Sequence, residues 1–349
     1  MELYLVTNAF AILSGLSLAV AVIFDKLFMS GDCYKGSATT PFFVSTVFGS
    51  VLGLVGTGLG WVLFYDPFVT FDDSIALLAQ MPLEVGCIAL AGSLCGNVLR
   101  NYFICFNHIN PTVIALCLAI IPVFVFFSTV FIDGSTITWS HGISIFCAVS
   151  GLVFLEFFSP ASEDNSERQQ SIRKYVSLVL LNGLSVGYIL LLYYTNRRIA
   201  LTADIAPIYA TSLSLPYFWI GVCCAGITAL RQADVRRYLD SIPQIPRYIS
   251  IIIALEVIGA SVYQFEAFGL AESDATLVQL IIGSNVIIIW FFDRYLGSRG
   301  KDKTATGYIT VFGIQVALDQ IEERPSLPML MLQICAIVLS LGGVLMFPY

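Results

Sequence analysis

Ten separate apolar stretches run through this chain of 349 residues, and most are roughly 20 residues long, the length that a helix needs to cross a bilayer. We place them at roughly 5–24, 41–64, 84–105, 111–131, 140–158, 175–195, 205–228, 248–268, 276–293 and 328–347. Charged residues make up only 12% of the chain, against roughly 25% in a soluble domain. The sequence therefore predicts an all-α polytopic membrane protein with ten transmembrane helices.

A polar segment divides these stretches into two groups of five. Residues 161–174, with SEDNSERQQ at their centre, separate residues 1–160 from residues 175–349. Shifting the chain by 164 residues aligns 110–114 with 274–278 and Phe126 with Trp290. Because five is odd, the second half must enter the bilayer from the opposite side. We therefore expect two inverted five-helix repeats that share a cavity at their interface.

The second half closes with an expanded loop at residues 294–327, in which the weakly apolar residues 307–318 are a candidate re-entrant or surface helix. In the second stretch, Gly49, Gly53, Gly56 and Gly60 fall on one helix face. Such a stripe lets a neighbouring backbone approach closely, so we interpret it first as a helix contact and second as part of a solute pathway.

Lysine and arginine residues are unevenly distributed between the two sets of loops. One set contains only Arg197 and Arg198, whereas the alternate set contains nearly all the others. The positive-inside rule then places both termini outside the cytoplasm, provided that the number of spans is even.

Several motifs in the first half resemble the EamA domain of the drug/metabolite transporter superfamily. They are Asn107-His108-Ile109-Asn110-Pro111-Thr112-Val113, then Ile121-Pro122-Val123-Phe124, then Ile132-Asp133-Gly134-Ser135-Thr136. Ser135 stands where that family usually has glutamate, and the second half resembles the domain more faintly. The resemblance implies a ten-helix transporter with a central cavity and no covalent cofactor. It also implies cytoplasmic termini, contrary to the charge distribution, so the orientation stays open.

Charged side chains inside the membrane are costly and often functional. Arg100 lies deep in the third stretch and shares a helix face with Asn97 and Asn101. These three residues are candidates for binding an anionic or polar group of a solute. The alternative is that Arg100 extends to nearby lipid head groups.

Glu256 in the eighth stretch is the candidate for coupling to protons or another cation. It shares a helix face with Tyr263, and its repeat position would allow a buried pair with Arg100. A carboxylate that can lose its partner can take up a proton; a static pair joining the two halves is the structural alternative. Further solute-binding candidates are Asn182, Tyr188, Tyr209, Tyr263, Gln279 and Asn285, although each taken alone is more often a helix-to-helix contact. Asp25, Glu156 and Asp293 lie near the ends of spans, and we interpret them as interfacial, with Asp25 as the first candidate for an exception.

Motifs for other chemistry are missing from the sequence. There is no phosphate-binding GxxxxGK[ST] loop, no HExxH motif and no CxxC spacing among the nine cysteines, so we expect no catalytic residues, no metal site and no cofactor. The leading hypothesis is a secondary transporter that moves a small organic metabolite or drug-like solute by alternating access, with protons as the candidate coupling ion. The alternative is a non-transporting receptor, scaffold or lipid-binding protein. We expect a multi-pass protein of the plasma (inner) membrane that contacts lipid and a small-molecule substrate but no nucleic acid; a homodimer is left open.

Overall fold

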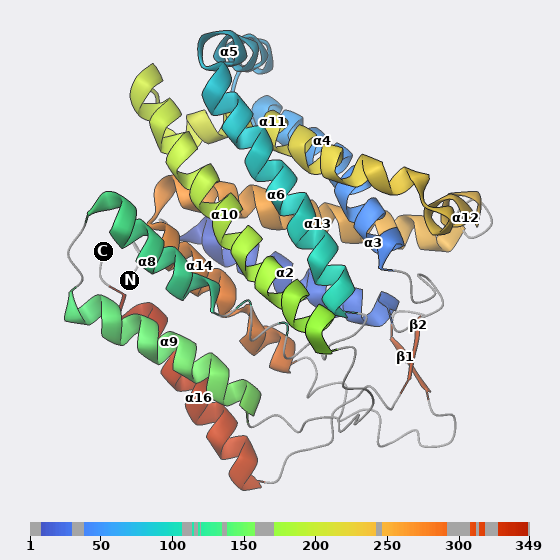
Figure 1. Ribbon diagram of the computed structural model, residues 1–349, viewed down its shortest axis with the longest axis vertical. Helices are drawn as coiled ribbons and strands as arrows, with labels where there is room; N and C mark the ends of the chain where they lie inside the picture. The colour runs from blue at the N-terminus through green and yellow to red at the C-terminus, as the bar shows by residue number, and fades with distance from the viewer. Residues whose placement is uncertain are drawn as a thin grey trace.

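The computed structural model describes residues 8–29, 38–106, 114, 118, 120–134, 138–157, 171–241, 246–291, 308–311, 314–317 and 327–347. Nearly all of the described secondary structure is helical (Figure 1). Each of the ten predicted stretches overlaps a helix. The motif at residues 107–113 and most of the predicted linker, residues 161–170, lie outside the described residues.

In the first half the helices are α2 (Ala9–Met29), α3 (Thr39–Phe43), the π-helical η1 (Val44–Phe48), α4 (Gly49–Phe64), α5 (Pro67–Gln80), α6 (Pro82–Phe106), α8 (Ile121–Asp133) and α9 (Trp139–Phe157). In the second half they are α10 (Ser171–Ala203), α11 (Pro207–Ile227), the 3₁₀-helical η2 (Thr228–Arg231), α12 (Ala233–Ser241), α13 (Pro246–Glu272), α14 (Ala275–Gly283) and α16 (Leu327–Leu345). Helix α10 thus begins inside the predicted linker, at Ser171.

Six helices in the described part of the chain are long and apolar enough to cross a membrane. They are Thr39–Phe64, Pro82–Cys105, Val176–Ala203, Pro207–Arg231, Ile252–Glu272 and Pro328–Leu345. Shorter apolar helices cover Ala9–Asp25, Ile121–Asp133 and Ala275–Phe291. This set of helices is that of an integral membrane protein.

Helix α4 shows how one segment serves both the lipid and the protein interior. Val51, Val55, Leu59 and Val62 recur at helical spacing and are each more than half exposed, which suits a face turned toward lipid. The opposite face carries the predicted glycine stripe. Gly53 packs against the ring of Trp219, as expected for a helix contact, whereas Gly49 lines the central cavity and no atom lies within 4 Å of a Cβ atom built on Gly60.

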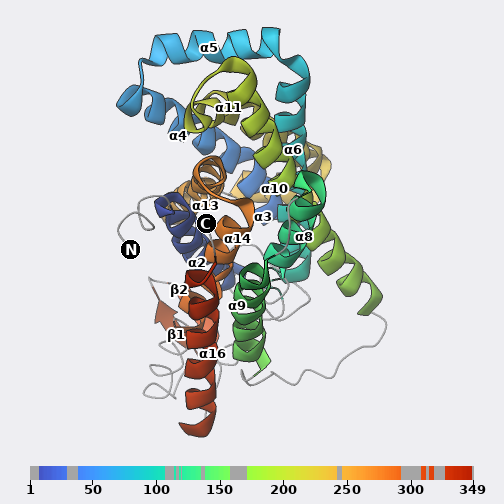
Figure 2. The same ribbon diagram turned by 90° about the vertical axis from the view of Figure 1, so that its left-hand side faces the viewer.

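Helix α5 occupies the segment between the second and third predicted spans. Asp66 caps the N-terminus of α5 by accepting hydrogen bonds from the backbone nitrogens of Phe68 (3.0 Å) and Val69 (3.4 Å). Pro67 at the first helical position favours the same start. Figure 2 shows α5 lying across the ends of the bundle helices. The buried face of α5, which carries Thr70, Ser74 and Leu77, packs on α11. There the Ser74 hydroxyl donates to the Leu213 carbonyl at 2.9 Å.

The prediction of a re-entrant or surface helix at residues 307–318 is wrong. Its described residues form two antiparallel strands, β1 (Tyr308–Val311) and β2 (Ile314–Ala317), with Tyr308 opposite Ala317 and Val311 opposite Ile314. Five of the eight residues in the two strands are β-branched, namely Ile309, Thr310, Val311, Ile314 and Val316, and such residues favour a strand over a helix.

Helices of the two halves pack against one another in matching pairs. The first helix of each half packs on the third helix of the other half, α2 on α13 and α10 on α6. The second helices, α4 and α11, contact each other, as do the fourth helices, α8 and α14. The helices are therefore interleaved, and neither half forms a separate body.

The fifth helices, α9 and α16, form a pair at one side of the bundle (Figures 1 and 2). A Cβ atom on Gly151 would overlap the backbone of α16 at Ser340, and one on Gly343 would overlap the backbone of α9 at Ala148. The contact is thus reciprocal, with small residues at equivalent places on both helices.

Candidate functional site

A cavity of about 130 Å³ lies at the centre of the bundle. Residues from α2, η1, α4, α6, α8, α10, α11, α13 and α14 line it, whereas α5, α9, α12 and α16 contribute none of the described lining residues. The volume is enough for roughly four water molecules. The cavity therefore lies where the first four predicted spans of each half meet.

One face of α13 forms a polar wall of this cavity. Glu256, Gly259, Tyr263 and Glu266 all line the cavity, and their spacing of three and four residues places them on one helix face. Both glutamates are 3% exposed. Ten residues of helix separate them, a rise of about 15 Å along the axis, so the wall carries one carboxyl group near each end and Tyr263 between.

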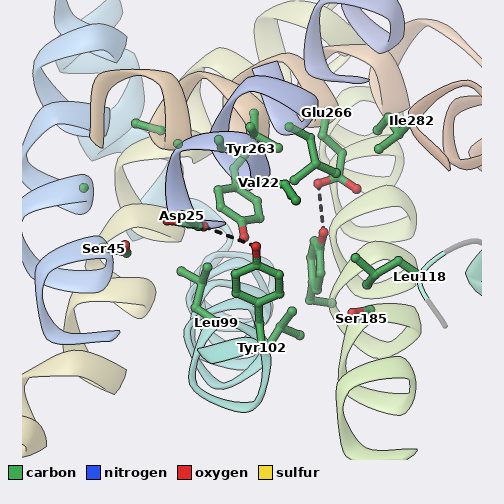
Figure 3. Close-up of a pocket in the computed structure, with 18 of the residues that line it drawn as sticks. Val22, Asp25, Ser45, Leu99, Tyr102, Leu118, Ser185, Tyr263, Glu266 and Ile282 are labelled. Carbon is green, nitrogen blue, oxygen red and sulfur yellow. Dashed lines mark hydrogen bonds between the residues drawn. The ribbon is translucent and has the colours of Figure 1, made fainter. Parts of the chain in front are cut away.

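Glu266 is held by two donors from other helices. The Tyr188 hydroxyl of α10 donates to Oε2 at 2.8 Å, and the Gln279 amide of α14 donates to Oε1 at 2.7 Å. Figure 3 shows Glu266 and its bond to the tyrosine hydroxyl at the cavity wall. Hydrogen bonds of this kind offset part of the cost of burying a carboxyl group.

Asp25, from α2, provides a second carboxyl group. The Tyr102 hydroxyl of α6 donates to its Oδ2 at 3.2 Å. In Figure 3 the hydroxyl groups of Tyr102 and Tyr263 point toward one another beside Asp25. The rings of Tyr102 from α6 and Tyr263 from α13 thus both lie next to the carboxyl group of Asp25.

Glu256 meets the π-helical turn η1. The Ser45 hydroxyl donates to Oε1 at 3.0 Å, and a Cβ atom on Gly49 would lie 3.0 Å from Oε2. Single π-helical turns are frequent at functional sites. Here the turn precedes α4 and presents Ser45 and Gly49 to the same carboxyl group.

The charges in the cavity are all of one sign. Three carboxyl groups line it, and no lysine, arginine or histidine does so among the described side chains. Carboxyl groups in such a place can take up protons or hold a positively charged group.

Asn285 adds an amide to the lining of the cavity and is 6% exposed. An amide can both donate and accept hydrogen bonds. Trp219 also lines the cavity, and its buried indole nitrogen has no acceptor among the described residues.

Five of the ten predicted site residues line the cavity: Tyr188, Glu256, Tyr263, Gln279 and Asn285. The other five lie elsewhere. The amides of Asn97 and Asn101 donate to carbonyls one turn earlier in their own helix, at 2.9 and 2.8 Å. Tyr209 donates to Asp73 of α5 at 2.8 Å, and Asn182 is outside the lining with its amide oxygen unpartnered.

The predicted pair between Arg100 and Glu256 does not form. Arg100 is exposed on α6 and is not among the lining residues, whereas Glu256 is buried with Ser45 as its donor. The two residues lie on helices that make no extensive contact, because α6 packs mainly on α10 and α11. The exposed position agrees with the alternative in which Arg100 extends outward.

Sequence reasoning missed Asp25, Tyr102 and Glu266 as site residues. Glu266 had a detectable signal, because it continues the spacing from Glu256 through Tyr263 on one face of α13. The sequence position of Asp25 indicated a place outside the cavity, since a residue near the end of an apolar stretch is expected to contact water. Only the packing of α2 against α13 places it inside.

Comparison with known proteins identifies the fold and no family. No family model matches this chain, and no curated protein matches it. One solved structure, described only as "Crystal structure of protein", is 13% identical to this chain, with a TM-score of 0.58 over 98% of this chain and 96% of its own length. At this identity the similarity shows a shared fold alone.

Proposed function

We propose that this protein is a secondary transporter that carries a small organic solute across a membrane by alternating access. The observation that carries the proposal is the cavity at the place where helices of both halves meet, with three carboxyl groups in its lining. Ionisable residues inside a membrane are costly, and they typically mark pathways for solutes or protons.

The helix pairing supports a protein with ten spans in two inverted repeats. The main contacts between helices of the two halves recur with the halves exchanged, as with α2 on α13 and α10 on α6, or α4 on α13 and α11 on α6. Inverted repeats of this kind place the solute site between the halves, and rocking of one half against the other opens the site to alternate sides.

The motifs that resemble the EamA domain agree with this interpretation, and we propose membership of the drug/metabolite transporter superfamily on their account. A plasma (inner) membrane location and a small-molecule substrate follow as part of the same proposal.

Coupling to protons is the second part of the proposal, with Glu256 as the principal candidate. Its carboxyl group is buried and faces the cavity, and one hydroxyl donor and no cation contact it among the described residues. A carboxylate in this situation can bind a proton in one state of the cycle and release it in another.

The test is a flux measurement on the reconstituted protein. Proteoliposomes that contain a pH-sensitive dye are mixed with single compounds from a metabolite library, and internal pH is recorded. We expect a subset of compounds to drive proton movement in wild-type vesicles and not in vesicles with Glu256→Gln. Solute movement without proton movement would contradict the coupling.

A matched control is Glu84→Gln, the same chemical change at a carboxyl group of α6 that lies outside the cavity lining. It should leave flux unchanged. If no compound moves through wild-type vesicles while ligands still stabilise the protein, the transporter proposal is wrong and a receptor or scaffold is favoured.

A further inference from the structure

The cavity contains an excess of negative groups whose charge no described side chain balances. Asp25, Glu256 and Glu266 approach it from α2 and from two levels of α13. Their hydrogen-bond donors are hydroxyl groups and an amide, which are neutral. These carboxylates would repel a negatively charged solute, whereas a positively charged group would balance part of their charge.

We propose that the solute is an organic cation, an amine in its protonated form, which the carboxyl groups of Asp25, Glu256 and Glu266 in the cavity lining attract. This assignment rests on the proposed function in that it names the solute class of the same cavity. A metal ion is disfavoured, because no group of three or more Asp, Glu, His or Cys side chains among the described residues is arranged to hold one.

The remaining lining fits the other parts of such a molecule. Tyrosine and tryptophan rings attract cations through their faces, and Tyr102, Tyr188, Tyr263 and Trp219 all line the cavity. Tyr263 is central, with its ring centroid 6.4 Å from those of both Tyr188 and Trp219. Aliphatic side chains cover much of the rest and would contact a hydrocarbon body.

Asn285 adds a neutral acceptor to the lining. It is 6% exposed and lines the cavity, and its amide oxygen can accept a hydrogen bond from an ammonium proton. The cavity of about 130 Å³ is close to the roughly 150 Å³ that holds one benzene molecule in a protein core. The solute should therefore have about one six-membered ring or an alkyl chain of similar size.

The experiment compares three probes of nearly equal shape and different charge: benzylamine, benzyl alcohol and benzoate. Binding to the purified full-length protein in lipid nanodiscs is measured by thermal shift and by isothermal titration calorimetry. We expect benzylamine to bind and the alcohol and benzoate to bind at least about 10-fold more weakly, because they cannot form charge-assisted hydrogen bonds with the carboxylates. A panel of alkyl amines and their alcohol counterparts extends the comparison in size.

Glu266→Gln should weaken benzylamine binding by about 10-fold to 100-fold, as expected for loss of a hydrogen bond to a charged group. Asp25→Asn provides a second variant if the first is poorly folded by size-exclusion chromatography. Glu84→Gln is the control and should bind benzylamine as the wild type does.

Tighter binding of benzoate or of the alcohol, or a panel in which no amine exceeds its alcohol counterpart, would overturn the assignment. Uptake of radiolabelled benzylamine into proteoliposomes separates this outcome from failure of the proposed function. Amine binding without uptake would support the cation site and contradict the transport function. Uptake of neutral solutes alone would support transport and contradict the cation site.

Discussion

The crossing of α6 with α11 is tightly packed, whereas the cavity wall of α13 borders open space. At the crossing, a Cβ atom on Gly92 would overlap the Phe218 carbonyl oxygen, and one on Gly221 would overlap that of Ala89. At the wall, Glu256 and Glu266 extend side chains into a cavity that remains open. Helix α6 takes part in both regions, with its glycine face in the crossing and Tyr102 in the cavity. The difference indicates that rigidity is concentrated beside the space that the solute would occupy.

The largest expected effect is at the crossing. Gly221→Ala should lower the free energy of unfolding by roughly 3 kcal/mol or more, because backbone and not a flexible side chain blocks the added methyl group. The measurement is the thermal midpoint and the folded yield in detergent. Gly58→Ala is the matched control, since no atom lies within 4 Å of a Cβ atom there; equal losses at both glycines would contradict the account of the crossing.

The same substitution at the cavity should separate binding from stability. In Gly49→Ala the new Cβ atom would lie 3.0 Å from Oε2 of Glu256, so the carboxyl group must shift by a few tenths of an ångström. We expect a stability loss of less than about 1 kcal/mol and a severalfold loss of benzylamine affinity by calorimetry. A large fall in the thermal midpoint with affinity retained would show that Gly49 belongs with the packing glycines.

Loss of one hydroxyl group gives a smaller effect on the same wall. Tyr188→Phe removes the 2.8 Å donor to Glu266 and should cost about 1 kcal/mol of stability, together with a change in benzylamine affinity. Tyr209→Phe removes an equally short bond, 2.8 Å to Asp73, outside the cavity. Calorimetry on both variants should detect changed affinity only in the first, and changed affinity in the second would count against the position of the site.

The smallest effect is expected at the ion pair between Arg198 Nε and Glu84 Oε1, 2.9 Å apart. The arginine side chain is 68% exposed and the glutamate side chain 11%, and pairs with one partner in water contribute about 1 kcal/mol or less. Arg198→Gln should therefore shift the thermal midpoint slightly, and the shift should be smaller at high salt. Benzylamine affinity should be unchanged, and a loss there would extend the functional region beyond the cavity.

Much of the fold could be predicted because apolar length is a local property of the sequence. The ten stretches needed no tertiary information. Two of the five predicted site residues that line the cavity, Glu256 and Tyr263, could be grouped because they share the helical spacing of α13. Arg100 was placed wrongly in a pair with Glu256, since spacing gives the shared face of a helix but not the direction of that face. Helix α5 was missed because Asp72 and Asp73 interrupt its apolar pattern. Which glycines form the tight crossing depends on the partner helix, and this cannot be predicted from the glycine spacing alone.

The interleaving of the two halves has a consequence for how the protein is made. Helix α2 packs on α13, whose first residue lies about 220 residues beyond the last residue of α2. At roughly 5–20 residues per second, a ribosome takes on the order of 10–40 s to synthesise that distance. During this interval the face of α2 that carries Asp25 has no native partner on α13. The insertion machinery or lipid head groups must therefore shelter a carboxyl group that the finished protein keeps at its centre.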